Sequence, residues 1–121
     1  MKFSLGPSEQ TGWGGIVLAD HRNDTVEVPV VRLDHVLKDD IFVDVLKIDI
    51  EGADTWAIMG AEQLLRSKKV GRIFYEENRP RMAELGIHSG EAKAFLESHC
   101  YQVQQIDVES SSDLFEFEAF I

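Results

Sequence analysis

Apolar residues are spread unevenly along the chain, and the first forty residues contain only short apolar runs. Residues 16–19 form one such run, which predicts a weak strand. At 26–30, valines alternate with other residues, a pattern typical of a half-buried strand. Pro29 places that strand at a sheet edge, because proline cannot donate to a ladder. We therefore expect residues 1–40 to form an irregular arm with one or two strands.

The pattern changes at residue 41, where an apolar run continues almost without interruption to residue 50. Such runs are typical of strands that are buried on both faces of a parallel sheet. A helix is predicted at 54–66, a strand at 70–75 and a second helix after a capping Ser89. Two further strands are predicted at 101–106 and 114–120. We expect one α/β domain, in which 41–121 form the core. Its sheet should be mostly parallel, with an antiparallel final hairpin.

Composition narrows the range of partners. The 121 residues include 22 acidic and 12 basic residues, for a net charge of -10, which disfavours nucleic acid and anionic membrane surfaces. No apolar run approaches the roughly 18 residues that suggest a membrane span. The start of the chain lacks the apolar core of a signal peptide, and a single cysteine, Cys100, cannot form an internal disulfide. We expect a soluble protein of the cytoplasm.

Acidic residues end two neighbouring strands of the predicted sheet. Asp49 and Glu51 close the first strand two positions apart, so they should share a face, and Glu76 with Glu77 closes the next. Carboxyl ends of strands border the ligand crevice in open α/β sheets, so we expect all four acids in one crevice. Asp49 or Glu51 has an alternative role as a helix cap. Four such acids offer oxygen ligands for a divalent cation, but no His or Cys spacing supports a transition-metal site, and acid clusters are usually solvated or paired with arginine. We therefore predict no metal site and expect Arg79 and Arg81 as ion-pair partners.

Two further residues are candidates for substrate binding. Trp13 lies in a glycine-flanked loop, where it can cover a substrate or simply anchor the loop to the domain. His35 follows Asp34 and is placed near the mouth of the crevice, although a surface histidine is the ordinary alternative.

Three stretches of the chain resemble the FkbM-type S-adenosylmethionine-dependent methyltransferases. They are VLKIDIEGAD at 45–54, MGAEQLL at 59–65 and VEVPVVRLDHVL at 26–37. The resemblance implies the C-terminal half of a class I, Rossmann-like methyltransferase sheet, with S-adenosylmethionine as cofactor and an oxygen of a small molecule or sugar as methyl acceptor. It places Asp49 and Glu51 beside the transferred methyl as catalytic residues, with Glu76 and Glu77 as substrate-binding residues nearby.

The family's cofactor loop, of the type Asp-x-Gly-Ala-Asn after a strand, does not occur in the chain. A nucleotide-binding glycine loop lies between a strand and a helix. The glycines at 12–15 follow no clear apolar strand and precede no helical pattern, so they do not match such a loop. Cofactor-binding residues are therefore unknown, and we expect the chain to be inactive without a cofactor-binding half. Whether Met1 is a natural start or the chain is a fragment stays open.

If the chain forms only the C-terminal half of a methyltransferase sheet, the strand at 41–50 lies at an exposed apolar edge. We expect either that the arm folds over this edge or that two copies associate through it, and a homodimer is the simplest closed solution. The alternative to an enzyme is a non-catalytic remnant, or a dimerisation or interaction module, that keeps the fold and an acidic crevice.

Overall fold

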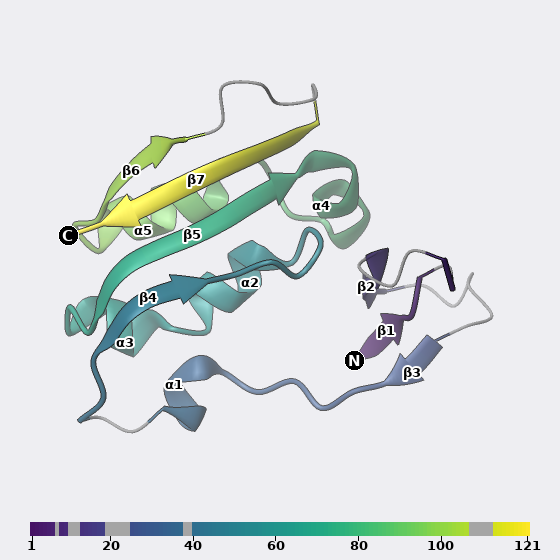
Figure 1. The fold of residues 1–121 in the computed structure, drawn as a ribbon, viewed down its shortest axis with the longest axis horizontal. Coiled ribbons are helices and arrows are strands. Elements are labelled where there is room, and N and C mark those ends of the chain that lie inside the picture. Colours follow the sequence, from purple (N-terminus) through teal and green to yellow (C-terminus); the bar gives the residue numbers. More distant parts are fainter. Residues whose placement is uncertain (7, 10–12, 19–24, 38–39, 107–112) are drawn as a thin grey trace.

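A computed structural model of the chain describes residues 1–6, 8–9, 13–18, 25–37, 40–106 and 113–121. These residues form two separate sheets (Figure 1). A small antiparallel sheet, in the order β2-β1-β3, contains β1 (Lys2–Ser4), β2 (Gly15–Val17) and β3 (Thr25–Glu27). A larger sheet, in the order β4-β5-β7-β6, contains β4 (Val43–Lys47), β5 (Val70–Asn78), β6 (Gln102–Gln105) and β7 (Leu114–Phe120).

The larger sheet mixes parallel and antiparallel pairs. β4 and β5 are parallel, as predicted, and β6 pairs antiparallel with β7, which confirms the final hairpin. The mostly parallel sheet is not confirmed, because β7 inserts between β5 and β6 and runs antiparallel to both. Stacking of Tyr75 on Phe117, with ring centroids 5.1 Å apart, accompanies this insertion. One of the three neighbour pairs is thus parallel.

Strand β4 is not buried on both faces, contrary to its apolar pattern. It pairs with β5 on one side, and no described strand pairs with its other side. Val45 is 56% exposed, whereas Leu46 and Ile48 pack against the core. The continuous apolar run therefore marks a strand with an uncovered edge and an uncovered face.

The predicted helix at 54–66 is divided into two. α2 (Asp54–Met59) ends at Gly60, and α3 (Glu62–Arg66) begins after Ala61. α3 has no side-chain cap from its own N-cap residue. A residue that precedes β4 in the chain supplies the cap instead.

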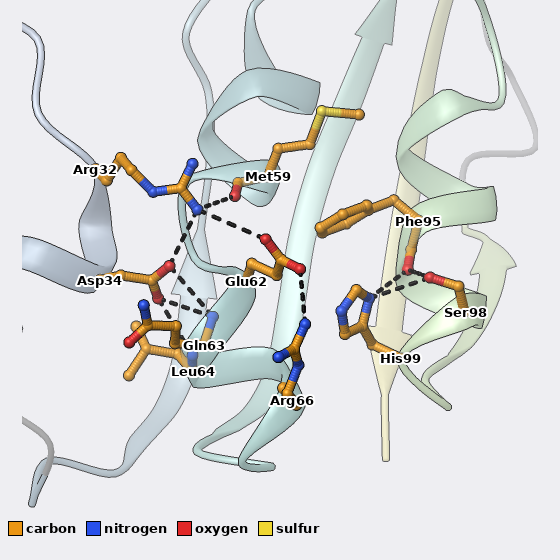
Figure 2. Close-up of polar contacts among 10 residues, drawn as sticks. All are labelled: Arg32, Asp34, Met59, Glu62, Gln63, Leu64, Arg66, Phe95, Ser98 and His99. Atoms are coloured by element: carbon orange, nitrogen blue, oxygen red, sulfur yellow. Dashed lines mark hydrogen bonds and ion pairs between the residues drawn. The ribbon is translucent and has the colours of Figure 1, made fainter.

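That cap is Asp34, in the short helix α1 (Leu33–Val36). Its carboxylate accepts hydrogen bonds from the backbone N–H groups of Gln63 (3.1 Å) and Leu64 (3.2 Å), as Figure 2 shows. Arg32 Nη2 contacts the same carboxylate at 3.3 Å and donates to the Met59 carbonyl at 2.9 Å. These contacts explain why the segment that leads into β4 needs an arginine and an aspartate two residues apart.

Two other helices complete the core. α5 (Glu91–Ser98) agrees with the prediction, and its buried residues are Ala92 and Leu96. α4 (Arg79–Leu85) was not predicted, although its end signals are in the sequence. Asn78 accepts a bond from the Arg81 N–H as N-cap, proline occupies the first turn, and Gly86 ends the helix in the left-handed conformation.

Helices cover one face of the larger sheet. Residues of α2, α3 and α5 pack on Ile73, Tyr75 and Ala119, and Figure 1 shows these helices behind the strands. The other face carries Arg72, Phe74 and Glu76, which are exposed or half-buried, and no described helix packs on it. No helix in the described ranges is long and apolar enough to span a membrane.

The arm has three strands, not one or two, because β1 was missed. β1 is bonded on both sides, to β2 and β3, so backbone pairing rather than an apolar pattern defines it. β2 lies against α4, and the arm sheet does not lie along the edge of β4 (Figure 1). The arm strands therefore do not pair with β4. Leu33 and Leu37 of the arm pack against the same core as Val43 and Leu46, and coverage of the β4 edge by the arm stays a prediction.

Candidate functional site

The loop between β4 and α2 makes a sharp turn that presents its acids. Glu51 has a φ of 51° and Gly52 a φ of 92°, both in the left-handed region. A Cβ atom at Gly52 would lie 2.5 Å from the Cβ of Arg81, so close packing as well as conformation requires glycine there. A non-glycine residue in the left-handed region, such as Glu51, is uncommon and tends to occur at functional sites.

The turn brings together three of the predicted acids. One carboxylate oxygen from each of Asp49, Glu51 and Glu76 lies within 4.8 Å of the others. Lys47 contacts Asp49 at 3.1 Å, and the Asn78 amide donates to Glu51 at 3.3 Å. The convergence of Asp49 and Glu51 with the end of β5 is thus confirmed, although Glu51 belongs to the turn and not to the strand.

Glu76 has the most unusual environment of the three. Its partial burial, and then the negative charges of Asp49, Asp54, Glu51 and Glu116, raise its pKa from 4.5 to about 7. An acid with a pKa near neutrality exists in both protonation states at physiological pH, which suits proton transfer. The environment of Glu76 therefore suits it to accept a proton.

Asp54 bonds the backbone on both sides of the acid cluster, and the sequence did not identify it as a site residue. Its side chain is 1% exposed, and its carboxylate accepts bonds from the backbone N–H groups of Ile50 and Glu76, both at 3.0 Å. Burial raises the pKa of Asp54, while the two backbone bonds oppose that shift. The signal that could have found it is an acid directly after Glu-Gly-Ala, but the apolar pattern shows residue 54 only as the first residue of the predicted helix 54–66.

A cavity of about 370 Å³ adjoins the cluster on the uncovered face of the sheet. Asp49, Glu76 and Glu116 supply its acidic lining, together with Lys47. Its apolar walls include Val45, Phe74, Ile106 and Phe117. This volume lies within the range of small-molecule sites, and the mixture of apolar walls with a few polar groups is typical of them.

Glu77 does not join the cluster, contrary to the expected single crevice. It is 2% exposed, and its carboxylate accepts bonds from the Ser89 hydroxyl at 2.6 Å and the Gly90 N–H at 2.7 Å. Side chains alternate along a strand, so neighbours on β5 face opposite sides. The prediction that Ser89 caps α5 with its side chain is also wrong, since Gly90 is the N-cap.

Trp13 and His35 lie outside the cluster. Trp13 is 61% exposed, and its backbone carbonyl accepts a bond from Arg81 at 3.5 Å, which ties it to the turn at Gly52. His35 is exposed on α1, which packs against α3. The structure therefore ties the Trp13 backbone to the turn through Arg81 and does not bring His35 to the acids.

The two arginines expected to pair with the acids have other partners. Arg79 lies over the Phe115 ring, 4.0 Å from its centroid. Arg81 forms an ion pair with Glu84 at 3.3 Å. Among the ion pairs of the described residues, the cluster has Lys47 as its basic partner.

Three converging carboxylates offer oxygen ligands of the kind that hard divalent cations prefer. No histidine or cysteine of the described ranges joins them. Exposed acid groups gather without an ion in many proteins, so this geometry alone assigns no metal.

Comparison with known proteins gives one match. The family model described as Methyltransferase FkbM domain matches residues 3–103. Neither the search of curated proteins nor the search of solved structures found a match. The matched range includes the arm, the acid turn, β5 and α5.

Proposed function

The chain belongs to the FkbM methyltransferase domain family, and from that premise we propose that it forms the acceptor side of a methyl-transfer site. The cofactor would be S-adenosylmethionine, and the acceptor an oxygen of a small molecule or sugar. The observation that supports this most is the convergence of Asp49, Glu51 and Glu76 within 4.8 Å at the carboxyl ends of two parallel strands. Ligands of open α/β sheets bind at this position.

S-adenosylmethionine would supply the methyl group, but the residues present do not fit the whole cofactor. Its crevice in an open α/β sheet lies where the strand order reverses, which requires a strand beside β4. The described residues leave that side of β4 unpaired, and the printed sequence has no Asp-x-Gly-Ala-Asn loop. We propose that the chain is inactive until a second half supplies these parts.

The chain's own residues would bind and deprotonate the acceptor. The Glu76 carboxylate accepts the proton of the acceptor hydroxyl, since its pKa of about 7 leaves it partly ionised at neutral pH. Asp49 and Glu51 accept hydrogen bonds from other hydroxyls or an amine of the acceptor and so orient it. Trp13, whose backbone is tied to the turn through Arg81, would cover the substrate. The proposed setting is the cytoplasm, which the single unpaired cysteine favours.

Calorimetric titration with S-adenosylmethionine tests whether the cofactor site needs a second half in addition to this chain. The chain alone should give no saturable heat, and saturable binding should appear once a family N-terminal half with the glycine loop is co-expressed. Saturable binding by the chain alone would overturn the proposal of an incomplete site.

The role of Glu76 is tested in the reconstituted protein, with S-adenosylhomocysteine formation measured over a panel of sugars and hydroxylated small molecules. Glu76→Gln should lower kcat/KM by about 10²–10⁴-fold, the usual range for loss of a general base. Glu97→Gln is the matched control, because Glu97 is an exposed acid on α5 with only a surface pair to Lys93. An unchanged rate for Glu76→Gln would exclude Glu76 as the base.

The second candidate function is an interaction module of the same fold. The observation that favours it is the unpaired edge of β4, next to exposed apolar side chains. A partner that pairs with this edge would explain the apolar strand without any catalysis. In that case the chain forms a stable assembly and the acids have no effect on it.

A further inference from the structure

The two edges of the larger sheet differ in character. Beside β4, Phe42, Val45 and Ile50 are 55%, 56% and 38% exposed, and no described strand pairs with this edge. The opposite edge is β6, whose exposed residues are glutamines. Exposed apolar edges invite pairing with another chain, and polar edges resist it. The β4 edge is therefore the one built for a partner.

We infer that a second copy of this chain pairs with β4, antiparallel and in the register that places Val45 opposite the partner's Val45. This inference rests on the interaction-module candidate: the second copy takes the side of β4 that a second half would occupy in the methyl-transfer proposal. A two-fold axis perpendicular to the sheet relates the copies, so the same patch serves both. Such an axis keeps the uncovered faces of both sheets on one side. Residues directly opposite each other must then point to the same side of the joined sheet.

This register is selected by strand length and charge. It pairs every residue of β4, with Val43 opposite Lys47 and Asp44 opposite Leu46 of the second copy. A shift by two residues in one direction sets Asp44 opposite Asp44 and leaves part of the strand unpaired. A shift by two residues in the other direction sets Leu46 opposite Leu46 and leaves Val43 and Asp44 without partners in β4, and a shift by four sets Lys47 opposite Lys47. Like charges directly opposite destabilise a strand pair, so the centred register is favoured.

The same register closes the exposed apolar surface. The two Val45 side chains meet at the axis, and extension of the pairing sets Phe42 opposite Ile48 and diagonal to Ile50 of the second copy. Diagonal neighbours are within reach of an aromatic side chain. Because both β4 edges are used and the glutamine-rich β6 edges remain, assembly stops at two chains.

Light scattering after size exclusion, on the full chain at micromolar concentration, measures the assembly. We expect twice the mass of one chain. Val45→Lys should give a single-chain mass, because it places two lysines opposite each other. Val26→Lys is the matched control: Val26 is 42% exposed on β3, in the separate arm sheet, and this variant should stay dimeric. Circular dichroism of each variant checks that it is folded.

Cysteine cross-linking tests the register. In a Cys100→Ser background, Val45→Cys should form an intermolecular disulfide on mild oxidation, because directly opposed Cβ atoms lie about 4.5–5.5 Å apart. Lys47→Cys should not, because its two copies would be about 13 Å apart along the strands.

A single-chain mass for the unmodified protein would overturn the inference and assign the edge to another occupant. A dimer that cross-links through Lys47→Cys, or not through Val45→Cys, would overturn the register. Neither result depends on cofactor binding, so failure here is separate from failure of the methyltransferase proposal.

Discussion

The two faces of strand β5 give neighbouring glutamates opposite roles. Glu77 faces the helices, where a hydroxyl and a backbone N–H bind its carboxylate at 2.6 and 2.7 Å. Glu76 faces the uncovered side, where burial and other acids raise its pKa to about 7. One acid is fully bonded and joins β5 to the start of α5, and the other is held among like charges. Alternation along one strand is therefore enough to separate an acid that stabilises the fold from one suited to chemistry.

The largest effect should come from removing the bonded acid. Glu77→Ala leaves the Ser89 hydroxyl and the Gly90 N–H without their acceptor and opens a void, so we expect a loss of about 3 kcal/mol in the free energy of unfolding. At neutral pH, Glu76→Ala should cost nothing or stabilise by up to about 1 kcal/mol, because it removes an acid that is held among like charges. Urea denaturation of both variants measures the contrast. Equal losses would show that the two faces do not differ as described.

The sequence placed Glu76 and Glu77 together because its apolar pattern ended β5 at residue 75. The strand continues to Asn78, since antiparallel pairing with β7 extends over those residues. Pattern reasoning ends a strand where apolar residues stop, but backbone pairing with a distant segment can continue it. The same cause hid β1, which is defined by pairing on both sides.

The parts of the site that follow from chain order were predictable. Asp49 and Glu51 at one strand end, and Glu76 at the next, follow from two parallel strands read along the sequence. The bond from Asp54 to the Glu76 N–H joins residues 22 apart, and local pattern cannot show it. The division of the helix at Gly60 likewise depends on Asp34, whose bond to Gln63 crosses 29 residues.

The second-largest effect should come from Asp54, which bonds the backbone N–H groups of Ile50 and Glu76. Asp54→Asn keeps one carbonyl oxygen and turns an NH₂ group toward one of the two backbone donors, Ile50 or Glu76. A buried donor without its acceptor costs about 1–3 kcal/mol, so we expect a loss of about 2 kcal/mol. Asp113→Asn, which changes an exposed acid just before β7, is the control. Hydrogen exchange of the Glu76 amide should also become faster, and unchanged exchange would argue against the bridge.

The third effect compares two buried tyrosines on the helix-covered side. The Tyr101 hydroxyl donates to the Val70 carbonyl at 2.7 Å, whereas the Tyr75 hydroxyl is buried without a hydrogen-bond partner among the described residues. Tyr101→Phe should cost about 1–1.5 kcal/mol, the net value of one hydrogen bond. Tyr75→Phe should cost nothing or stabilise slightly, because it removes an unpaired polar atom. Thermal unfolding of the two variants side by side measures this, and a clear loss for Tyr75→Phe would reveal an additional partner of its hydroxyl.

The smallest effect is the pH dependence that the uncovered face adds. The pKa of Glu76 is 4.5 before folding and about 7 in the fold, so folding favours its protonated form. Its contribution to stability is complete below pH 4.5 and is lost as pH rises through 7. Glu76 is only partly buried, so screening by solvent limits the loss to about 1 kcal/mol. Urea denaturation across this range should show a falling free energy of unfolding that Glu76→Gln flattens. Asp54, whose pKa burial also raises, leaves a residual slope in the same direction. If Glu76→Gln keeps the full slope, the acid on the uncovered face titrates like an ordinary surface glutamate, and its contrast with Glu77 is one of bonding alone.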